Sequence, residues 1–231
     1  MFSVEKVLEQ LKAKARPDQL EGMSRFGIVG EKRLGVSIPD LRRLAREVGK
    51  NHELALKLWA SGFEDARILA SMVEVPEQVS EEQMEDWVKD LGSWDVCDQL
   101  CMNLLDRVKG IRKKIINWSR REGEFVRRAS FSLIAVISVH DKQVPDEEFS
   151  AFFPLIKQGA LDERNYVKKA VSWALRNIGK RNSNLNRMAL ETARGIRQMD
   201  SRAASWIASD TIRELESEKV QKRLREKARR K

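Results

Sequence analysis

An aromatic residue and a carboxylate four residues apart, Trp94 and Asp98, are the pair in this sequence best suited to chemistry. The preceding Gly92-Ser93 predicts that a helix starts here, with Ser93 as its N-cap and Asp95 in the first turn, where the helix dipole favours an anion. Residues four apart share one helix face. An indole face attracts a cation by about 0.5–2 kcal/mol, and the carboxylate adds negative charge, so the pair suits a positively charged ligand. On this stretch alone, Trp94 as a core residue and Asp98 as a solvated carboxylate remain an alternative.

The composition is that of a soluble, helix-prone globular protein. Of the 231 residues, 42% are hydrophobic and 34% are charged, and only five are proline. The first residues lack the basic-then-apolar order of a signal peptide, and no apolar run is long enough to span a bilayer. We therefore expect a cytoplasmic protein without membrane contact, and no feature calls for more than a monomer.

The positive charge is concentrated at the C-terminus. The formal net charge is +9, and residues 219–231 contain eight Lys or Arg and one Glu. We therefore expect a single repeat domain over residues 1–218 and a basic tail over residues 219–231. Such a tail often contacts nucleic acid, but a frayed helix end is equally compatible with it, and whether it folds stays open.

The cysteines and histidines give no indication of a metal or cofactor. Cys97 and Cys101 lie four apart on one predicted helix, where a disulfide is poorly oriented and no zinc spacing is present. His52 and His140 are isolated. We expect free, buried thiols, no metal and no cofactor.

The elements that must position Trp94 and Asp98 are all predicted to be helices. Ser37 and Pro39 open a helix that ends near Gly49, Ser80 and Gln83 form a capping box, and the Trp94 helix continues to Leu105. The glycine-rich region 22–38 is expected to be short helix and loop.

A repeated pattern indicates how these helices are arranged. Phe125-Val126-Arg127-Arg128-Ala129 returns 41 residues later as Tyr166-Val167-Lys168-Lys169-Ala170, and a looser copy starts at Asp200 and reaches Trp206. Helical hairpins that repeat every 30–41 residues predict an all-α fold, an α-solenoid of HEAT-like or armadillo-like repeats. The same helix of each hairpin would line its concave face.

That face would gather basic and aromatic side chains around the Trp94–Asp98 pair. Arg128 lies opposite the apolar residues of its helix, so we expect it to project away from the core. Trp173, Arg176 and Lys180 share a helix face. Basic residues with interleaved tryptophans suit DNA phosphates and sugars, and we expect the DNA-binding residues to be Arg43, Arg127, Lys169, Arg176, Lys180 and Arg202. Taken singly, each of them could equally be a solvated helix charge, and Trp173 a core residue.

Three segments in this order resemble the HEAT-like-repeat alkylpurine DNA glycosylases of bacteria, the AlkD type. They are Ser93 to Asp98, Val126 to Ala129 and Lys169 to Arg176, within a similarity that extends from about Val36 to Leu215. The resemblance implies that Asp98 is the catalytic carboxylate and that Trp94, Trp173 and Arg128 complete the site. The chain departs from the best-understood members around Ser93 and across residues 22–35, which leaves the substrate range open.

The resemblance implies hydrolysis of the N-glycosidic bond of cationic alkylated purines, such as 3-methyladenine or 7-methylguanine, in double-stranded DNA. A cationic base leaves without a general acid, which agrees with the lack of a site histidine. It also implies a bacterial protein that is nucleoid-associated through DNA. Two alternatives remain: a catalytically silent DNA-binding protein that recognises damaged or branched DNA, and a HEAT-like protein-binding adaptor.

Overall fold

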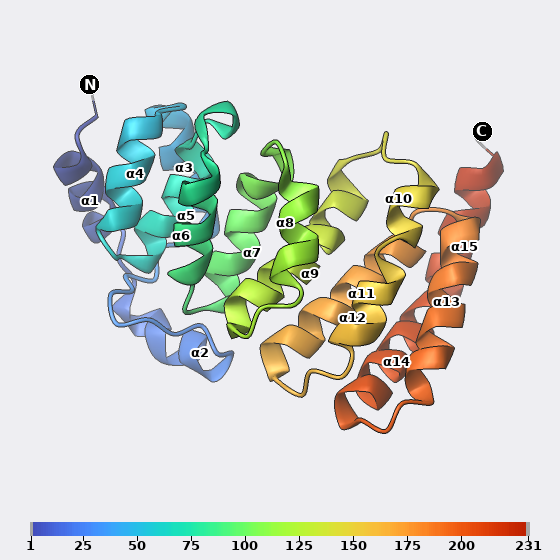
Figure 1. Ribbon diagram of the computed structural model, residues 1–231. Helices are drawn as coiled ribbons and strands as arrows, with labels where there is room; N and C mark the ends of the chain where they lie inside the picture. Colours follow the sequence, from blue (N-terminus) through green and yellow to red (C-terminus); the bar gives the residue numbers. More distant parts are fainter. Residues whose placement is uncertain (1, 230–231) are drawn as a thin grey trace. The chain divides into compact units, whose positions relative to one another are not determined.

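Every regular element in residues 2–229, the part of the chain that the computed structural model describes, is a helix (Figure 1). The chain divides between Ile111 and Arg112 into two compact units. The first unit contains α1 (Val4–Ala13), η1 (Pro17–Gln19), α2 (Leu20–Arg25), α3 (Ile38–Val48), α4 (His52–Ala60), α5 (Glu64–Val73), η2 (Pro76–Gln78), α6 (Glu81–Lys89), α7 (Trp94–Asn103) and η3 (Leu105–Arg107). The division falls at the start of α8 (Ile111–Trp118), and the second unit continues with α9 (Glu124–His140), α10 (Asp146–Ser150), α11 (Phe153–Gly159), α12 (Asn165–Gly179), α13 (Ser183–Arg197), α14 (Arg202–Leu215) and α15 (Glu218–Arg229).

The predicted helix starts are largely confirmed by the caps. Ser37 accepts a hydrogen bond from the Asp40 amide, and Pro39 lies in the first turn of α3, which ends at Gly49 with a φ of 75°. Ser80 accepts a hydrogen bond from the Gln83 amide, but the Gln83 side chain donates to Glu74 instead of returning to Ser80. Only half of the predicted capping box therefore forms, because a buried carboxylate competes for the amide.

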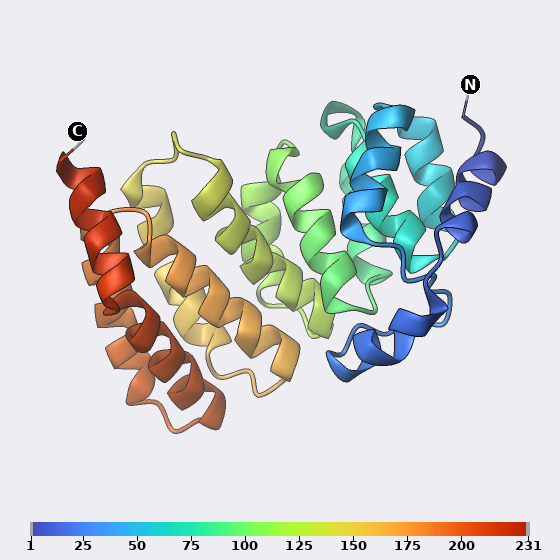
Figure 2. The same cartoon turned by 180° about the vertical axis from the view of Figure 1, so that it is seen from behind.

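The second unit shows the expected packing of repeated helices. α12 packs against α9 on one side and α14 on the other, while α11 and α13 cover this layer (Figure 2). Two helix contacts in this unit have room only for glycine. A Cβ on Gly159 of α11 would lie 2.3 Å from the Phe131 ring of α9, and one on Gly179 of α12 would lie 2.5 Å from Leu215 of α14. Close packing of this kind holds the repeated helices in fixed register.

Residues 218–229 form the amphipathic helix α15. Val220 and Leu224, one turn apart, are buried, and Lys227 Nζ donates to the carbonyl oxygens of Lys180 and Arg181 at the end of α12. The basic segment 219–231 is therefore a packed helix as far as Arg229, and residues 230–231 lie outside the described residues. The packing of α15 against α13 and α14 supplies the apolar contact that charge patterning alone does not reveal.

In the first unit, the glycine-rich segment of residues 26–37 is held by hydrogen bonds to α5 and to Arg16. The buried Asp65 carboxylate, at the start of α5, accepts hydrogen bonds of 2.7 Å from the amides of both Leu34 and Val36. Glu64 donates its amide to the Lys32 carbonyl, and Arg16 donates its amide to Leu34. This segment, which we call the α2–α3 loop, is thus a fixed part of the unit.

We predict that Asp65→Ala lowers the free energy of unfolding by about 2–4 kcal/mol, because two buried amides lose their acceptor. The matched control is Asp18→Ala, which removes an exposed carboxylate whose bond is to the neighbouring Gln19. Denaturant titration measures the loss, and trypsin cleavage at Lys32 reports release of the α2–α3 loop. Equal stability of the two variants would contradict this role for Asp65.

A second prediction concerns Asp162, which binds the guanidinium groups of Arg127 and Arg164 at 2.8 and 2.6 Å. Burial alone would raise the pKa of Asp162, but the hydrogen bonds from the two arginines outweigh it and lower the pKa to about 2. Because the folded-state pKa lies below the unfolded value, the stabilisation is present above about pH 4 and is lost as the pH falls towards 2.

We therefore expect Asp162→Asn to be less stable than the wild type by about 2 kcal/mol at pH 7. The difference should shrink progressively between pH 4 and pH 2.5 in denaturant titrations. A stability difference that stays constant over this range would show that the ionised carboxylate is not its source.

Candidate functional site

The start of α7 is held by an ion pair that the sequence did not indicate. Arg33 in the α2–α3 loop binds both carboxylate oxygens of Asp95, at 2.8 and 3.0 Å, and both side chains are largely buried. Ser93 is the N-cap residue, but its hydroxyl donates to Asp95 at 2.5 Å and makes no capping bond. Asp95 is therefore a structural anchor, and its charge is matched by Arg33.

Trp94 and Asp98 lie on the open side of α7, as their spacing predicts. Both are half-buried, whereas Val96, Cys97 and Leu100 of the same helix are buried. The Trp94 indole N–H donates to the Phe26 carbonyl at 3.0 Å, so the α2–α3 loop also fixes the plane of the ring. Cys97 and its neighbour Cys101 are free and buried, as expected.

Arg128 in the second unit departs from the sequence prediction. We expected its side chain to project away from the core, yet the residue is only 5% exposed. Its guanidinium donates to the Tyr166 carbonyl at 2.6 Å, at the start of α12. The reason is that α12 packs directly over α9 and covers this face. A buried guanidinium is held in one orientation, which a catalytic or phosphate-binding role would require.

Trp173 and Lys169 occupy the outer face of α12. Trp173 is half-buried and Lys169, one turn before it, is exposed. Ala170, Val171 and Ala174 on the same helix are buried against its neighbours. Trp173 is therefore neither a full core residue nor a freely solvated one, and part of its ring is available for contact.

Three of the predicted phosphate-binding cations already have carboxylate partners. Arg127 binds Asp162, Arg176 binds Asp210 and Glu214, and Lys180 binds Glu214 at 2.7 Å. Burial would raise the pKa of Glu214, but the hydrogen bonds from Lys180 and Arg176 lower it, so the carboxylate stays charged. To reach a phosphate, Arg176 and Lys180 would have to leave this pairing. Arg43 and Arg202 are exposed, and Arg43 lies 3.8 Å from Asp40.

The predicted site is divided between the two units. Trp94 and Asp98 belong to the first, together with Arg43, and Arg128 and Trp173 belong to the second, with the other predicted DNA-binding residues. Trp94 and Asp98 share α7, whereas Arg43 lies on α3, which packs against α5 and is not among the helices packed on α7. In the second unit the predicted residues lie on or at the ends of α9, α12 and α14, and α12 packs against both of the others.

Sequence reasoning missed Arg33 and other polar residues that are buried in the first unit. One is Glu64, which begins α5, lies 3.6 Å from Arg67 and has its pKa raised by burial. His52, which looked isolated, has its Nδ1 2.7 Å from the buried carboxylate of Glu74. The partners of Arg33 and His52 lie 62 and 22 residues away along the chain, and no periodic pattern links them.

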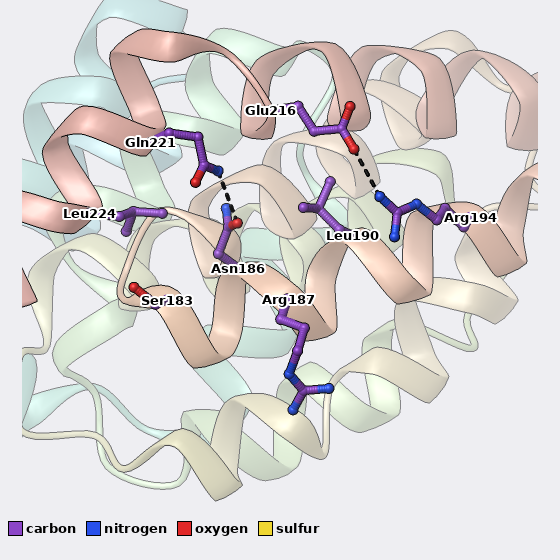
Figure 3. Close-up of a pocket in the computed structure, with 8 residues that line it drawn as sticks. All are labelled: Ser183, Asn186, Arg187, Leu190, Arg194, Glu216, Gln221 and Leu224. Carbon is purple, nitrogen blue, oxygen red and sulfur yellow. Dashed lines mark hydrogen bonds and ion pairs between the residues drawn. The ribbon is translucent and has the colours of Figure 1, made fainter.

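A pocket of about 400 Å³ lies elsewhere, between α13 and the segment that joins α14 to α15 (Figure 3). Its polar residues bind one another: Arg194 pairs with Glu216, and Gln221 donates to Asn186. None of the predicted site residues lines it. Among residues 2–229, no cluster of three or more His, Cys, Asp or Glu is arranged for a metal ion, and no helix has the length and apolar character needed to cross a membrane.

Comparison with known proteins agrees with the helical repeats. A solved structure with 17% sequence identity aligns with a TM-score of 0.76, over 92% of this chain and 95% of its own. It belongs to a family described as related to the HEAT-like repeat DNA glycosylases, with affinity for branched DNA structures. The fold is therefore that of the HEAT-like repeat proteins, as the sequence predicted.

The uncharacterised protein Lin0241 of Listeria innocua is 23% identical over 202 residues, which cover 85% of this chain and 87% of that protein. Residues 7–215, which include every predicted site residue, match the family described as DNA alkylation repair enzyme. The chain belongs to the DNA alkylation repair enzyme family.

Proposed function

We propose that this protein is a DNA glycosylase that hydrolyses the N-glycosidic bond of cationic alkylated purines in duplex DNA, of the 3-methyladenine and 7-methylguanine type. The observation that carries the proposal is the Trp94–Asp98 pair on the half-buried face of α7, whose first turn is anchored to the α2–α3 loop through Asp95 and Trp94. Membership of the DNA alkylation repair enzyme family supports it. The reaction would begin base-excision repair of alkylated DNA.

The chemistry requires a fixed anion and little else. A purine alkylated on a ring nitrogen is already cationic, so the electrons of the breaking C1′–N bond neutralise the departing base. Positive charge then develops on the sugar, which the Asp98 carboxylate opposes. Asp98 also orients a water molecule for attack on C1′ and accepts its proton. The products are the neutral base and an abasic sugar.

The aromatic residues and Arg128 complete the proposed site. Trp94 and Trp173 would place their ring faces against the deoxyribose and the cationic nucleotide. The hydrogen bond from the Trp94 indole to Phe26 orients that ring before DNA arrives, which reduces the entropy lost on binding. Arg128 would supply the positive charge that binds a phosphate beside the lesion.

The roles proposed for these residues suit a site that is open to solvent. Nothing in this scheme requires a deep pocket for the base, since the sugar and the charge are what the site recognises. The same scheme implies tolerance of alkyl groups larger than methyl. Release restricted to methylated bases would argue for a closed pocket instead.

A second candidate function is DNA binding without cleavage. Two observations favour it: the solved structure cited above belongs to a family with affinity for branched DNA, and Arg176 and Lys180 are already paired with carboxylates. A protein that binds DNA through other cations and does not hydrolyse it would fit both. The two candidates differ in whether Asp98 is needed for a chemical step.

We predict that Asp98→Asn lowers the single-turnover rate of base release from methylated duplex DNA by at least 100-fold. The estimate follows from the roughly 3–4 kcal/mol that one preorganised electrostatic group contributes in other enzymes. DNA affinity should change less than threefold, because the amide keeps the size of the carboxylate. The matched control is Asp86→Asn, which changes an exposed carboxylate on α6 in the same unit.

Measurement of released base and of binding on the same samples separates the candidates. Base release that persists in Asp98→Asn would exclude Asp98 as the catalytic group. Tight DNA binding by a wild-type protein that releases no base would favour the silent DNA-binding protein.

A further inference from the structure

A five-residue pattern recurs on two neighbouring helices of the second unit. On α12 it is Lys169-Ala170-Val171-Ser172-Trp173, and on α14 it is Arg202-Ala203-Ala204-Ser205-Trp206. In both, the two residues after the cation are buried, while the cation and the tryptophan four residues later remain accessible. α12 and α14 pack against each other (Figure 2). The contacts that join the two helices are offset by 38 residues, as in the Ser172–Asp210 bond, so Trp206 lies beside Lys168 near the start of α12, more than one turn before the level of Trp173.

Trp206 is exposed in a way that core packing does not explain. It is 39% exposed, and the Lys168 ammonium lies 5.4 Å from its ring centroid. Arg202, one turn before it on the same face, is exposed. No ion pair among residues 2–229 uses Arg202, Lys168 or Lys169. An accessible indole thus lies beside two cations, Lys168 and Arg202, that form no salt bridge in the described part of the chain.

The position of α14 against α12 is fixed by polar contacts. Glu163, just before α12, accepts hydrogen bonds from the Ser201 hydroxyl at 2.8 Å and the Ala203 amide at 3.1 Å, at the first turn of α14. The bond from Ser201 lowers the pKa of Glu163, so the carboxylate is charged at neutral pH. About two turns further along, Ser172 donates to Asp210 at 2.7 Å. These contacts hold Trp206 at a set place relative to α12.

Along the interface between α12 and α14, some cations form salt bridges and others do not. Towards the C-terminal end of α12, Arg176 and Lys180 are engaged by Asp210 and Glu214. Towards the N-terminal ends of α12 and α14, Lys168, Lys169 and Arg202 have no salt bridge within 4 Å among the residues that the structure describes, although the charged Glu163 carboxylate acts on Lys168 at longer range. Any polyanion that contacts this pair of helices therefore meets its attractive charge near Trp173 and Trp206.

We propose that Trp206, with Arg202 and Lys168, forms a second contact for the DNA backbone, one repeat beyond Trp173. The indole face would pack against a deoxyribose, and the guanidinium and the ammonium would bind the adjacent phosphates. The proposal rests on the proposed function, because it takes the face of α12 that carries Trp173 as part of a DNA interface. The contact serves binding and takes no part in base release itself.

The test measures binding of undamaged duplex DNA by fluorescence anisotropy at several salt concentrations. We expect Trp206→Ala to weaken binding about five- to tenfold, and Trp206→Phe to retain most of the affinity, since a ring remains. Arg202→Gln should reduce the slope of log affinity against log salt by about 0.9, the value for one lost phosphate contact. The matched control is Leu56→Ala on α4, whose side chain is 38% exposed. Thermal melting checks that each variant is folded.

The outcomes distinguish this proposal from the proposed glycosylase activity. Unchanged affinity in both Trp206→Ala and Arg202→Gln, with base release intact, would overturn the Trp206 contact alone. A loss confined to DNA with unpaired nucleotides would overturn the backbone assignment in favour of base stacking. Binding that depends on Trp206 in a protein without base release would support the contact and contradict the glycosylase. A wild-type protein with no affinity for DNA would overturn both.

Discussion

The bidentate ion pair between Arg33 and Asp95 is the contact on which the arrangement of the first unit depends. It joins the α2–α3 loop to the first turn of α7, beside the indole that the same loop holds through the Phe26 carbonyl. The loop can follow this path because Gly30 and Gly35 adopt positive φ values, and a Cβ on Gly30 would lie 2.6 Å from Glu64. An irregular, glycine-rich segment thus fixes the first turn of the regular helix that carries Trp94 and Asp98.

In the second unit, electrostatics decides which basic residues are available to a ligand. Carboxylates on α14 and before α12 neutralise Arg127, Arg176 and Lys180, and these pairs lock adjacent helices together. Cations without such partners remain near the helix N-termini. The net positive charge of the protein is therefore a poor guide to the cations that a ligand can reach, because carboxylates already pair several basic residues across the repeats.

The sequence was sufficient to predict helix starts and the repeated helices. It was insufficient to predict which residues form ion pairs between distant parts of the chain. Ser37 and Pro39 marked the start of α3, and the spacing of Trp94 and Asp98 placed them on one accessible face. Helical periodicity predicted the wrong exposure for Arg128, because it does not show which neighbour covers a face. Arg33 lies 62 residues from Asp95, and the partners of Arg176 and Lys180 lie 34 to 38 residues away, so only the folded chain reveals that these charges are used.

The proposed function requires that Asp98 and Arg128 both contribute to release of the base. A double-mutant cycle tests it directly, with Asp98→Asn and Arg128→Gln measured singly and together in single-turnover base release. If both side chains act on the same transition state, the double variant should lose little more activity than the more damaging single variant. Losses that multiply independently would show that the two residues do not share a site and would contradict the account.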